Sequence, residues 1–535
     1  MEFDCEYLTY ESTGFFTPLT TDYVAENKKL TPFYNYPVSE IGLQQAISAR
    51  KNFPVNRSLL VKQLRMQYTD ITLTTQQEQY LQSLLQSNTF TICTAHQPVI
   101  FTGPLYFIYK IIHAIKLADE LSKQSTENNF VPIFYMGSED ADLDELGHMN
   151  INGQKLIWET EQTGAVGRML VDKSLLKLID LLAGQLEVEP FGKKLITLFR
   201  QSYTEGETVQ QCTLWLVNEL FKDYGLLIII PDNPALKKQF ETVVKKEIAE
   251  QFSHATASET IIQLSLHYKP QAHGRELNLF YLKGNHRERI EKVGEDWIVK
   301  AMKLRFSKEE IFQEVENYPE RFSANVILRP LFQEMILPNI VFIGGGGEMA
   351  YWLELKKVFE VANVFYPMLI LRNSFLFVNE EHELLATKLG FIIQDFFKPK
   401  ELLINELVNK GSLLQLNLEK EKEDLRQLYK RIEDIAGKVN LTLDQHTRAL
   451  EHRGIEKLDA LEKKMFRAEK RKFEAQQRQI EKLRKQFFPA GGLQERNENF
   501  SMLYSKYGKS WIRAVYDSSP PALTQRFSIV KLKDE

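Results

Sequence analysis

The chain has 535 residues, more than a single hydrophobic core usually supports, so we expect two or three structural units. A content of 43% hydrophobic and 26% charged residues is typical of a globular protein, and the formal net charge of −4 argues against a nucleic-acid or membrane-surface partner. The three cysteines are scattered without C-x-x-C spacing, which argues against a disulfide framework or a zinc site and fits a reducing cytoplasm.

The first 90 residues predict mainly helices. The N-terminus, MEFDCEYLTYE, lacks the basic start and the apolar stretch of a signal peptide. Helical patterns then alternate with turn signals such as LTPFYNYP at 30–37. The longest apolar runs of the chain, such as LLIII at 226–230, are too short to span a bilayer, so we expect no membrane segment.

From residue 90 onward the sequence predicts a parallel sheet. TFTICT at 89–94 and NNFVPIFYMG at 128–137 are typical of buried parallel strands, and a helix at about 104–123 separates them. This strand–helix–strand succession predicts a right-handed βαβ unit. Further strands are expected in GLLIIIPDNP (225–234), NIVFIGGGGEMAYWLELKKVF (339–359) and VFYPMLILRNSFLFV (364–378).

We therefore predict an α/β protein with a doubly wound parallel sheet at its core. The first part of the core covers 1–150 and the second part covers 321–380. Between them, 151–320 is an insertion with its own helices and strands. A helical arm follows at 381–488, and the C-terminal segment 489–535 docks back on the core.

The arm shows an apolar repeat typical of coiled coils. Leucine, isoleucine and valine recur with 3,4,3,4 spacing from Leu425 to Val439, and a second stripe runs from Leu458 to Phe487. Gly454 lies between the stripes, where we expect the helix to break. The pattern fits an antiparallel helical hairpin, and the same stripe can serve a second subunit, so we expect a homodimer. The basic excess around KKMFRAEKRKF is interpreted as a solvated face rather than a nucleic-acid site.

The stretch TAHQPVIFTGPLYFIYKIIHAIKLA, 94–118, contains the first candidate site. His96 and Gln97 stand at the end of a predicted strand, where open α/β sheets bind ligands. Gly103 allows a ligand to approach the backbone, and Pro104 suits the first turn of a helix, whose amides attract anions.

Tyr106 and Lys110 extend this candidate site along the helix. They are four residues apart and so share a face, and Lys110 can reach a phosphate or a carboxylate. The alternative is that Gly-Pro only makes a corner and that Lys110 is a surface lysine.

The second candidate is the acidic loop MGSEDADLDELGHMN, 136–150. Its like charges repel one another unless a cation, an amine or a hydrogen-bond donor compensates them. An EF-hand is excluded because Glu145 and Ile151 stand where a glycine and a bidentate glutamate are needed. A magnesium-nucleotide or amine-binding role remains open, and so does a loop that merely caps the next helix. The candidate side chains are those of Glu139, Asp140, Asp142 and His148.

The third candidate is IGGGGEMAYW, 343–352. Consecutive glycines cost chain entropy, so a backbone requirement such as a ligand cradle is expected at Gly344 and Gly345. Glu348 stands where phosphate-binding loops carry lysine, which favours an amine or a hydroxyl-rich sugar over a polyphosphate. A dinucleotide fingerprint fits only loosely, because its third glycine is missing.

Two arginines form the fourth candidate. Arg329 in ILRPLFQE and Arg372 in LRNSF each end an apolar run, and either can grip a carboxylate or phosphate in bidentate fashion. Structural salt bridges are the alternative. No G-x-S-x-G elbow, H-E-x-x-H motif or cysteine-nucleophile context occurs, which favours binding and group transfer over hydrolysis through an acyl-enzyme.

Taken together, these motifs resemble the bacillithiol biosynthesis cysteine-adding enzymes, a cysteine ligase family. The matching stretches are TAHQ with GPLYFIYK, SEDAD with His148, RPLFQE, IGGGGEMAYW, LRNSF, and GLQER followed by KYG. They run from about 90 to about 510. The sequence departs from the family pattern at His96, Ala141 and Gly346, where the family carries glutamine, histidine and proline. No role carries over to Ala141, and the departures leave open a shift in substrate.

The resemblance implies a Rossmann-like core akin to nucleotidylyltransferases and class I synthetases, a connective-peptide-like insertion and a coiled-coil dimerisation arm. The implied reaction joins the carboxyl group of cysteine to the amine of glucosaminyl-malate and yields the low-molecular-weight thiol bacillithiol. A free carboxylate needs activation, so ATP and magnesium are expected from the chemistry.

The resemblance also assigns roles to the candidates. Catalytic roles are expected for Lys110, Glu139, Asp140, His148 and Glu348. Asp142 is the magnesium candidate. Substrate contacts are expected from His96, Gln97, Gly103, Pro104, Tyr106, Arg329, Gly344, Gly345, Trp352, Arg372 and Ser374.

Two other functions remain open. One is a nucleotidylyl- or aminoacyl-transferase-like enzyme with another substrate, although HIGH and KMSKS motifs are absent. The other is a non-catalytic coiled-coil scaffold whose α/β head binds a metabolite.

Overall fold

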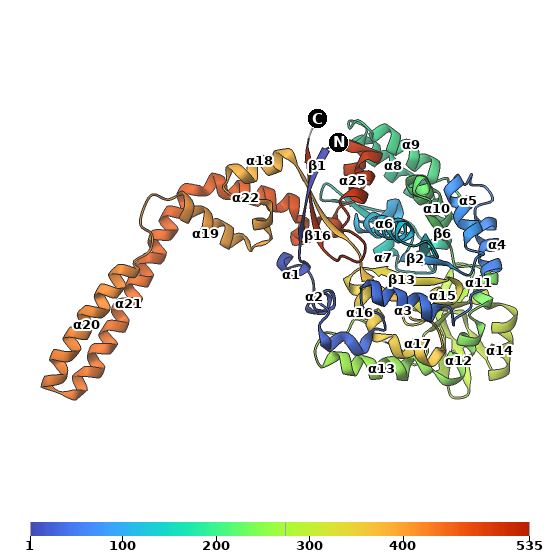
Figure 1. Ribbon diagram of the computed structural model, residues 1–535, viewed down its shortest axis with the longest axis horizontal. Helices are drawn as coiled ribbons and strands as arrows, with labels where there is room; N and C mark the ends of the chain where they lie inside the picture. Colours follow the sequence, from blue (N-terminus) through green and yellow to red (C-terminus); the bar gives the residue numbers. More distant parts are fainter. Residues whose placement is uncertain (1, 273, 534–535) are drawn as a thin grey trace. The chain divides into compact units, whose positions relative to one another are not determined.

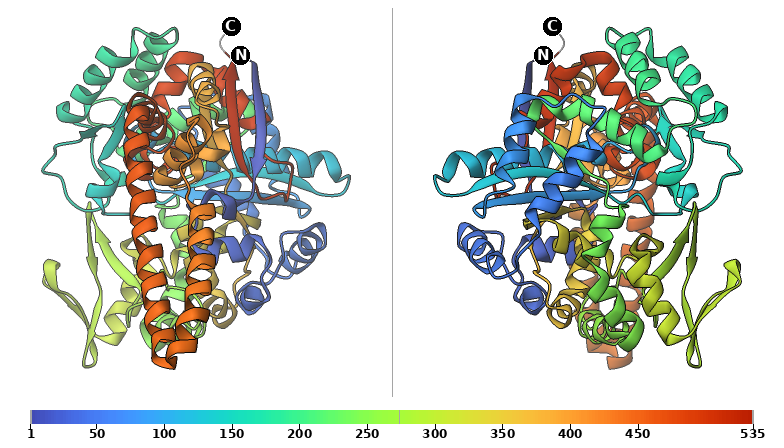
Figure 2. Two further views of the ribbon diagram at one scale, coloured as in Figure 1. Left: turned by 90° about the vertical axis from the view of Figure 1, so that its left-hand side faces the viewer. Right: turned by 90° about the vertical axis from the view of Figure 1, so that its right-hand side faces the viewer.

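The computed structural model describes residues 2–272 and 274–533. The chain forms two compact units (Figures 1 and 2). The first comprises Met1–Phe377 and Gly492–Glu535, and the second comprises Val378–Gly491. The predicted arm, 381–488, lies within the second unit.

A five-stranded parallel sheet forms the core of the first unit. Its strands are β2 (Thr89–His96), β3 (Asn129–Met136), β6 (Leu227–Ile229), β13 (Asn339–Gly344) and β14 (Met368–Leu371). The spatial order is β14-β13-β2-β3-β6, and every neighbouring pair is parallel. The strands are buried along almost their whole length, as expected of a parallel sheet covered on both faces, and the predicted sheet is confirmed. β6 comes from within the range predicted as an insertion.

The sheet is wound in two directions from its centre. α6 (Tyr106–Gln124) connects β2 to β3, whereas α16 (Gly346–Glu354) and α17 (Lys356–Ala362) connect β13 to β14. The two connections run outward from the adjacent pair β2–β13, so right-handed crossovers place their helices on opposite faces. The point between β2 and β13 is therefore a topological switch point, where such sheets bind ligands beyond their carboxyl ends.

A second, three-stranded sheet joins the two ends of the chain. Its order is β1 (Glu2–Leu8), β16 (Phe527–Lys533) and β15 (Ser374–Asn379), and β1 is antiparallel to β16 (Figure 1). β1 and β16 were not predicted from the sequence. Each strand pairs with a partner more than 500 residues away, which no local pattern reveals.

Helices and small antiparallel sheets surround the core of the first unit. The N-terminal helices are α1 (Tyr10–Thr13), α2 (Pro18–Val24), α3 (Glu40–Arg50), α4 (Arg57–Gln67) and α5 (Thr75–Ser83). Later helices are α7 (Leu143–Leu146), α8 (Lys173–Leu186), α9 (Gly192–Ser202), α10 (Val209–Phe221), α11 (Pro234–Lys238), α12 (Glu241–Glu250), α13 (Phe252–Ser265), α14 (Lys308–Asn317) and α15 (Arg329–Ile336). The C-terminal helices are α23 (Gln494–Asn497), α24 (Ser501–Tyr507) and α25 (Lys509–Asp517).

The additional strands form one hairpin and two small sheets. The hairpin is β4 (His148–Ile151) with β5 (Gln154–Ile157). One sheet has the order β12 (Phe322–Ala324), β7 (Leu279–Lys283), β8 (His286–Arg289). The other has the order β11 (Leu304–Phe306), β10 (Asp296–Val299), β9 (Glu291–Val293).

The second unit consists of helices. They are α18 (Glu380–Lys388), α19 (Lys400–Gly411), α20 (Glu419–Val439), α21 (Leu441–Lys470) and α22 (Glu474–Phe487). α20 and α21 lie side by side as the predicted antiparallel hairpin (Figures 1 and 2). Among the residues that the structure describes, no helix combines the length and the apolar character needed to cross a bilayer.

The predicted helix break at Gly454 is wrong. The chain turns at Asn440, whose side-chain oxygen accepts a hydrogen bond from the amide of Thr442 and caps α21. Gly454 lies inside α21 and faces the neighbouring helix, because an added Cβ would come within 2.9 Å of Leu425 Cδ2. A glycine in a helix costs about 1 kcal/mol relative to alanine, which a well-packed hairpin tolerates when the position needs a small residue.

Candidate functional site

A cavity of about 870 Å³ opens at the carboxyl ends of the core strands. Residues after β2, β3, β13 and β14 line it, so it occupies the switch point of the sheet. Its remaining wall comes from residues 271–329 and from Arg496, which follows the second unit. The cavity brings together these predicted residues: His96, Gln97, Tyr106, Lys110, Glu139, Asp140, Arg329, Gly345, Glu348 and Arg372.

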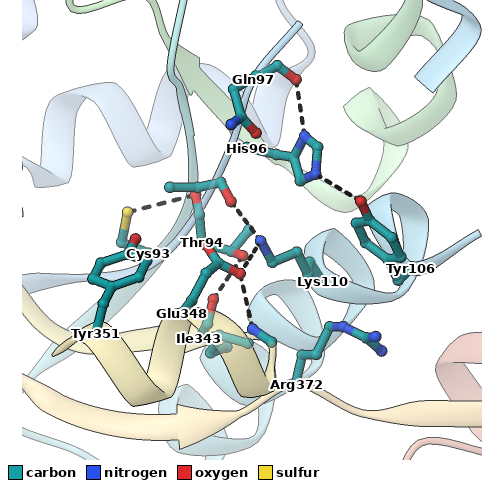
Figure 3. Close-up of polar contacts among 12 residues, drawn as sticks. Cys93, Thr94, His96, Gln97, Tyr106, Lys110, Ile343, Glu348, Tyr351 and Arg372 are labelled. Carbon is teal, nitrogen blue, oxygen red and sulfur yellow. Dashed lines mark hydrogen bonds and ion pairs between the residues drawn. The ribbon is translucent and has the colours of Figure 1, made fainter. Parts of the chain in front are cut away.

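Lys110 and Glu348 form an ion pair across the switch point (Figure 3). Lys110 projects from α6 with its side chain 3% exposed, and its Nζ also donates to the carbonyl of Ala95 at 2.7 Å. Glu348 accepts a hydrogen bond from the amide of Gly345 at 2.8 Å. Burial would raise the pKa of Glu348, but Lys110 and this amide outweigh it and lower the pKa. The two charges therefore compensate each other, and both residues line the cavity.

His96 presents a neutral ring to the cavity. Its Nδ1 lies 3.0 Å from the carbonyl oxygen of Gln97, which can only accept, so Nδ1 carries the hydrogen (Figure 3). Nε2 is then an acceptor, and the hydroxyl of Tyr106 lies 3.4 Å from it. Burial, reinforced by the positive charge of Lys110, lowers the pKa of His96 to about 4. A long bond to Tyr106 leaves Nε2 able to accept a hydrogen from a ligand.

Glu139 belongs to a buried ion-pair network. It pairs with Lys237, whose side chain is 4% exposed, and accepts a hydrogen bond from Ser323 Oγ at 3.0 Å. Lys237 also lies 3.6 Å from Asp232, which Arg168 holds through two contacts of 2.6 Å. The carboxylate of Glu139 is thus already compensated by the protein.

Asp140 and Glu145 are the carboxylates of the cavity that form no ion pair with another described residue, although the charge of Arg287 acts on Asp140. Asp140 accepts hydrogen bonds from Gln97 Nε2 at 3.0 Å and from the amide of Asp142 at 3.2 Å. Burial, together with the charges of Asp140 and Asp142, raises the pKa of Glu145. This edge of the cavity fits a cation or an ammonium group.

The rest of the acidic loop lies outside the cavity. Asp142 accepts a hydrogen bond from the amide of Glu145 at 3.0 Å and caps α7. His148 Nδ1 donates to the carbonyl of Asp144 at 2.7 Å and does not line the cavity. In the described ranges, no group of three or more histidine, cysteine, aspartate or glutamate side chains is arranged to hold a metal ion. A magnesium ion on one or two carboxylates and a bound phosphate needs fewer protein ligands, and in this cavity Asp140 and Glu145 are the carboxylates that would have to supply them.

Most of the positive charge that lines the cavity comes from arginines. Arg329 donates to the hydroxyl of Tyr351 at 2.8 Å, and Arg287 stacks over Phe280 with 3.9 Å to the ring centroid. Neither forms an ion pair with another described residue. The same holds for Arg275 and Arg496, whereas Arg372 pairs with Glu495 at 2.7 Å. Unpaired cations therefore outnumber unpaired carboxylates, and the cavity is complementary to a ligand with several negative charges.

Some predicted site residues do not reach the cavity. Gly103 has φ +60°, and its carbonyl accepts from Asn499 Nδ2, while the amide of Leu105 donates to the carbonyl of Glu498 at 2.8 Å. The segment 498–499 therefore covers the start of α6, so the expected anion site at Gly103 and Pro104 is closed to ligands.

Three further predicted residues lie in the protein core and do not line the cavity. Trp352 is fully buried and stacks on Phe342 with 4.3 Å between ring centroids, so it does not line the cavity. Ser374 is buried and donates to Glu495 at 3.1 Å. Gly344 is the last residue of β13, one position before the cavity wall begins.

Comparison with known protein families accounts for the whole of this architecture. Residues 3–373 match the family model described as bacillithiol biosynthesis BshC, N-terminal Rossmann-like domain. Residues 375–532 match the model described as bacillithiol biosynthesis BshC, C-terminal coiled-coil domain. The chain belongs to the BshC family. The resemblance carried by its motifs and the Rossmann-like class are thereby confirmed.

Full-length relatives agree with this assignment. A protein of Flavobacterium johnsoniae is 37% identical over 534 residues, covering 99% of this chain and all of the relative. Proteins of Flavobacterium psychrophilum and Christiangramia forsetii are each 38% identical, covering 99% and 98% of this chain and 100% and 98% of theirs. All three are described as "Putative cysteine ligase BshC". The expectation of a ligase agrees with these descriptions.

Within this BshC chain, the sequence analysis missed several cavity residues. Arg275 and Arg287 carry no motif that sets them apart from ordinary surface positions, and Tyr351 lies in the IGGGGEMAYW motif but was not singled out as a site residue. Glu145 was recognised only as one charge of the acidic loop. Arg496 did carry a signal, because it lies in the GLQER stretch that matches the family. No local pattern, however, shows that this stretch packs beside lining residues that lie more than 100 positions earlier in the chain.

Proposed function

We propose that this chain catalyses the cysteine-adding step of bacillithiol biosynthesis, in which the carboxyl group of cysteine is joined to the amine of glucosaminyl-malate. Membership of the BshC family and the description of its relatives support this proposal. A chain whose three cysteines are free thiols also suits the reducing cytoplasm in which such a thiol would be made.

The charge balance of the cavity is the observation that carries the proposal. Among the described residues, Arg275, Arg287, Arg329 and Arg496 form no ion pair with a carboxylate, and Asp140 and Glu145 form no ion pair with a cation. Glucosaminyl-malate brings two carboxylates and one amine, so its charges match this distribution. The acidic edge formed by Asp140 and Glu145 suits the amine, and the arginines suit the carboxylates.

Formation of the amide requires activation of the cysteine carboxylate, and we propose that ATP and magnesium supply it. When bound, ATP provides a phosphate or adenylate leaving group for that carboxylate. In the chain itself, the unpaired arginines would hold phosphate oxygens, and Asp140 and Glu145 would hold the magnesium ion or the amine.

His96 is the group best placed to orient the attacking amine. Its Nε2 is an acceptor because Nδ1 donates to Gln97. A neutral imidazole accepts a hydrogen bond from an amine without competing for the negative groups of the substrate. The glutamine found in the family pattern can accept through its amide oxygen, so the departure at His96 is compatible with the same role.

Reconstitution tests the proposed reaction directly. The purified chain would be incubated with cysteine, glucosaminyl-malate and magnesium-ATP, and bacillithiol would be measured by mass spectrometry. We expect product only when all components are present, and the nucleotide product, AMP or ADP, distinguishes an adenylate from an acyl phosphate. Binding of the substrates without any turnover would contradict the proposal and favour a metabolite-binding scaffold. Product from another acyl donor would favour a related transferase.

Variants of one loop provide a matched comparison. Asp140→Asn removes an uncompensated carboxylate from the cavity, so we expect kcat/KM to fall by about tenfold or more, the scale of a lost charged hydrogen bond. Asp144→Asn changes a carboxylate of the same loop that does not line the cavity, and we expect little effect. Equal activity of the two variants would contradict the assignment of the acidic edge.

We also propose that the chain forms a homodimer through the α20–α21 hairpin. A stripe of apolar side chains remains exposed on the hairpin, with Ile435 and Val439 exposed by 66% and 76%. Leu428, Leu443, Leu450 and Leu461 of the same hairpin are also exposed, by 38% to 48%. A coiled-coil stripe that one hairpin leaves uncovered is suited to a second copy of the same stripe.

A further inference from the structure

The short helix α23, which follows the second unit, carries a buried carboxylate that holds a cavity arginine. Glu495 is fully buried. Its Oε1 accepts hydrogen bonds from Arg372 Nη2 at 2.7 Å and from Ser374 Oγ at 3.1 Å, and its Oε2 accepts from the amide of Phe375 at 3.2 Å. All of these partners lie more than 100 residues before Glu495 in the chain.

These contacts determine the orientation of Arg372. Its Nη1 donates to the carbonyl of Asn373 at 3.0 Å and to Ser374, so both terminal nitrogens are engaged on the protein side. These bonds use three of the five N–H groups, and Nε–H is one of the two that remain; Nε lies beside Gly345, where an added Cβ would be 3.5 Å from it. Gly345 precedes α16, and the first residues of that helix line the cavity. Glu495 therefore directs the open edge of the guanidinium toward the cavity.

The next residue, Arg496, adds a second cation to the same wall. Its side chain lines the cavity, and it forms no ion pair with any residue in the described part of the chain. Burial and the positive charge of Arg372 lower the pKa of the Arg496 guanidinium. Arg372 pairs with Glu495, whereas Arg496 pairs with no carboxylate among the described residues, so an anionic group of a ligand would compensate the second charge.

α23 is anchored at this place independently of the ligand. Gln494 accepts a hydrogen bond from the amide of Phe377 at 3.1 Å and donates to the carbonyl of Phe377 at 3.4 Å. The chain therefore leaves the first unit and returns to it at adjacent positions. As a result, residues from the region that matches the coiled-coil family model reach the cavity of the Rossmann-like region.

We propose that α23 is a working part of the active site, in which Arg496 binds an oxyanion of a substrate and Glu495 positions Arg372 beside it. The oxyanion is a carboxylate of the malyl group or a phosphate of ATP. The identity of these two ligands rests on the proposed function, whereas the oxyanion site itself rests on the geometry.

The role of Arg496 is tested by calorimetric titration of the full chain with L-malate and, separately, with magnesium-ATP. We expect Arg496→Gln to weaken binding of one probe by about tenfold or more, the range for a lost hydrogen bond to a charged group. The probe that is affected identifies the oxyanion. Arg513→Gln is the control, because Arg513 is exposed on α25 and pairs with Asp517 at 2.7 Å. Unchanged affinity of Arg496→Gln for both probes would overturn the proposal.

The role of Glu495 needs a readout that a purely structural carboxylate would not change. Asp172→Asn is the matched control, because Asp172 also accepts three hydrogen bonds, from Leu175, Ser174 and Trp158, but does not line the cavity. We expect both Glu495→Gln and Asp172→Asn to lower Tm. Well below Tm, only Glu495→Gln should weaken binding of the probe by several-fold, and Glu495→Asp should restore part of the affinity. If the Glu495→Gln chain is folded and binds the probe with wild-type affinity, the positioning role of Glu495 is contradicted.

These titrations separate the oxyanion site from the proposed reaction. If the variants lose affinity but the wild-type chain makes no bacillithiol, the site stands and the proposed function fails. If the wild-type chain makes bacillithiol and the variants bind and react normally, the function stands and the site assignment fails.

Discussion

Lys110 and Glu348 show how a charge inside the cavity is compensated by a residue from a distant part of the chain. Lys110 comes from α6 and Glu348 from α16, and the pair joins the two halves of the sheet (Figure 3). Such a pair is costly to break, because one partner then remains buried without its counter-charge. The compensated residues hold the site together, and the uncompensated ones remain for ligands.

A double-mutant cycle on this pair tests that interpretation. Glu348→Gln leaves the buried ammonium of Lys110 unpaired, so we expect a loss of about 3 kcal/mol in the free energy of unfolding. Lys110→Met should cost less, because Glu348 is 24% exposed and can be hydrated. The double variant should be more stable than Glu348→Gln alone. Urea unfolding measures all three, and additive losses would show that the pair is not coupled.

Glu334 predicts a measurable pH dependence of stability. It is fully buried in α15, and burial, although opposed by Arg50, raises its pKa from 4.5 to about 7. Between these values the folded chain binds more protons than the unfolded chain, so the contribution of Glu334 to stability is full below pH 4.5 and is lost as the pH rises through 7.

The comparison of wild type with Glu334→Gln isolates this contribution. The difference in free energy of unfolding between the two proteins should shrink as the pH rises from about 4.5 to about 7. Denaturant titrations at several pH values measure it. A difference that stays constant over this window would show that Glu334 is ionised in the folded chain.

At the scale of elements, the position of the hairpin turn is open to a direct test. Asn440→Ala removes the cap of α21, and we expect a loss of about 1 kcal/mol. Gly454→Ala should cost little, because the gain in helix propensity, about 1 kcal/mol, offsets a shift of the Leu425 methyl group. Gly454→Pro should disrupt α21 strongly. Thermal unfolding followed by circular dichroism at the helix band distinguishes them, and tolerance of proline would place the turn at Gly454.

The start of α16 offers a physical reason for Gly346, which stands where the family pattern of the sequence analysis has proline. Proline is favourable at the first position of a helix, which is where Gly346 stands. An added Cβ would, however, lie 2.9 Å from Thr20 Oγ1. We therefore expect that Gly346→Pro alone does not raise Tm. The double variant Gly346→Pro, Thr20→Ala should have a higher Tm than Thr20→Ala alone. A higher Tm for Gly346→Pro by itself would show that Thr20 is no obstacle.

At the scale of the whole molecule, the exposed apolar stripe predicts the oligomeric state. Ile435→Lys combined with Val439→Lys should convert the proposed dimer into a monomer, because charges replace side chains that a second copy would bury. Sedimentation equilibrium measures the mass. Leu413→Lys is the control, since Leu413 is fully exposed outside the hairpin and should leave the mass unchanged. A monomeric wild-type chain would contradict the proposed dimer.

Local sequence patterns determined a large part of this architecture. Continuous apolar runs such as β2 and β3 require burial on both faces, so they specify a parallel sheet before any contact is known. The 3,4 repeat likewise specifies the helices of the second unit. The same patterns place His96 at a strand end, and Lys110 and Glu348 on the helices that follow two strands, where an open α/β sheet binds its ligands.

Only the tertiary structure decided which of these groups can meet a ligand. The sequence predicts Lys110 and Glu139 as catalytic charges, but in the structure Lys110 pairs with Glu348 and Glu139 pairs with Lys237. Arg372 likewise pairs with Glu495. The pairing of β1 with β16 and the closure of the α6 start by residues 498–499 depend on segments hundreds of residues apart. The physical reason is common to all of them: sequence periodicity reports the face that a residue buries, whereas compensation of a charge depends on distance in space, which only the folded chain sets.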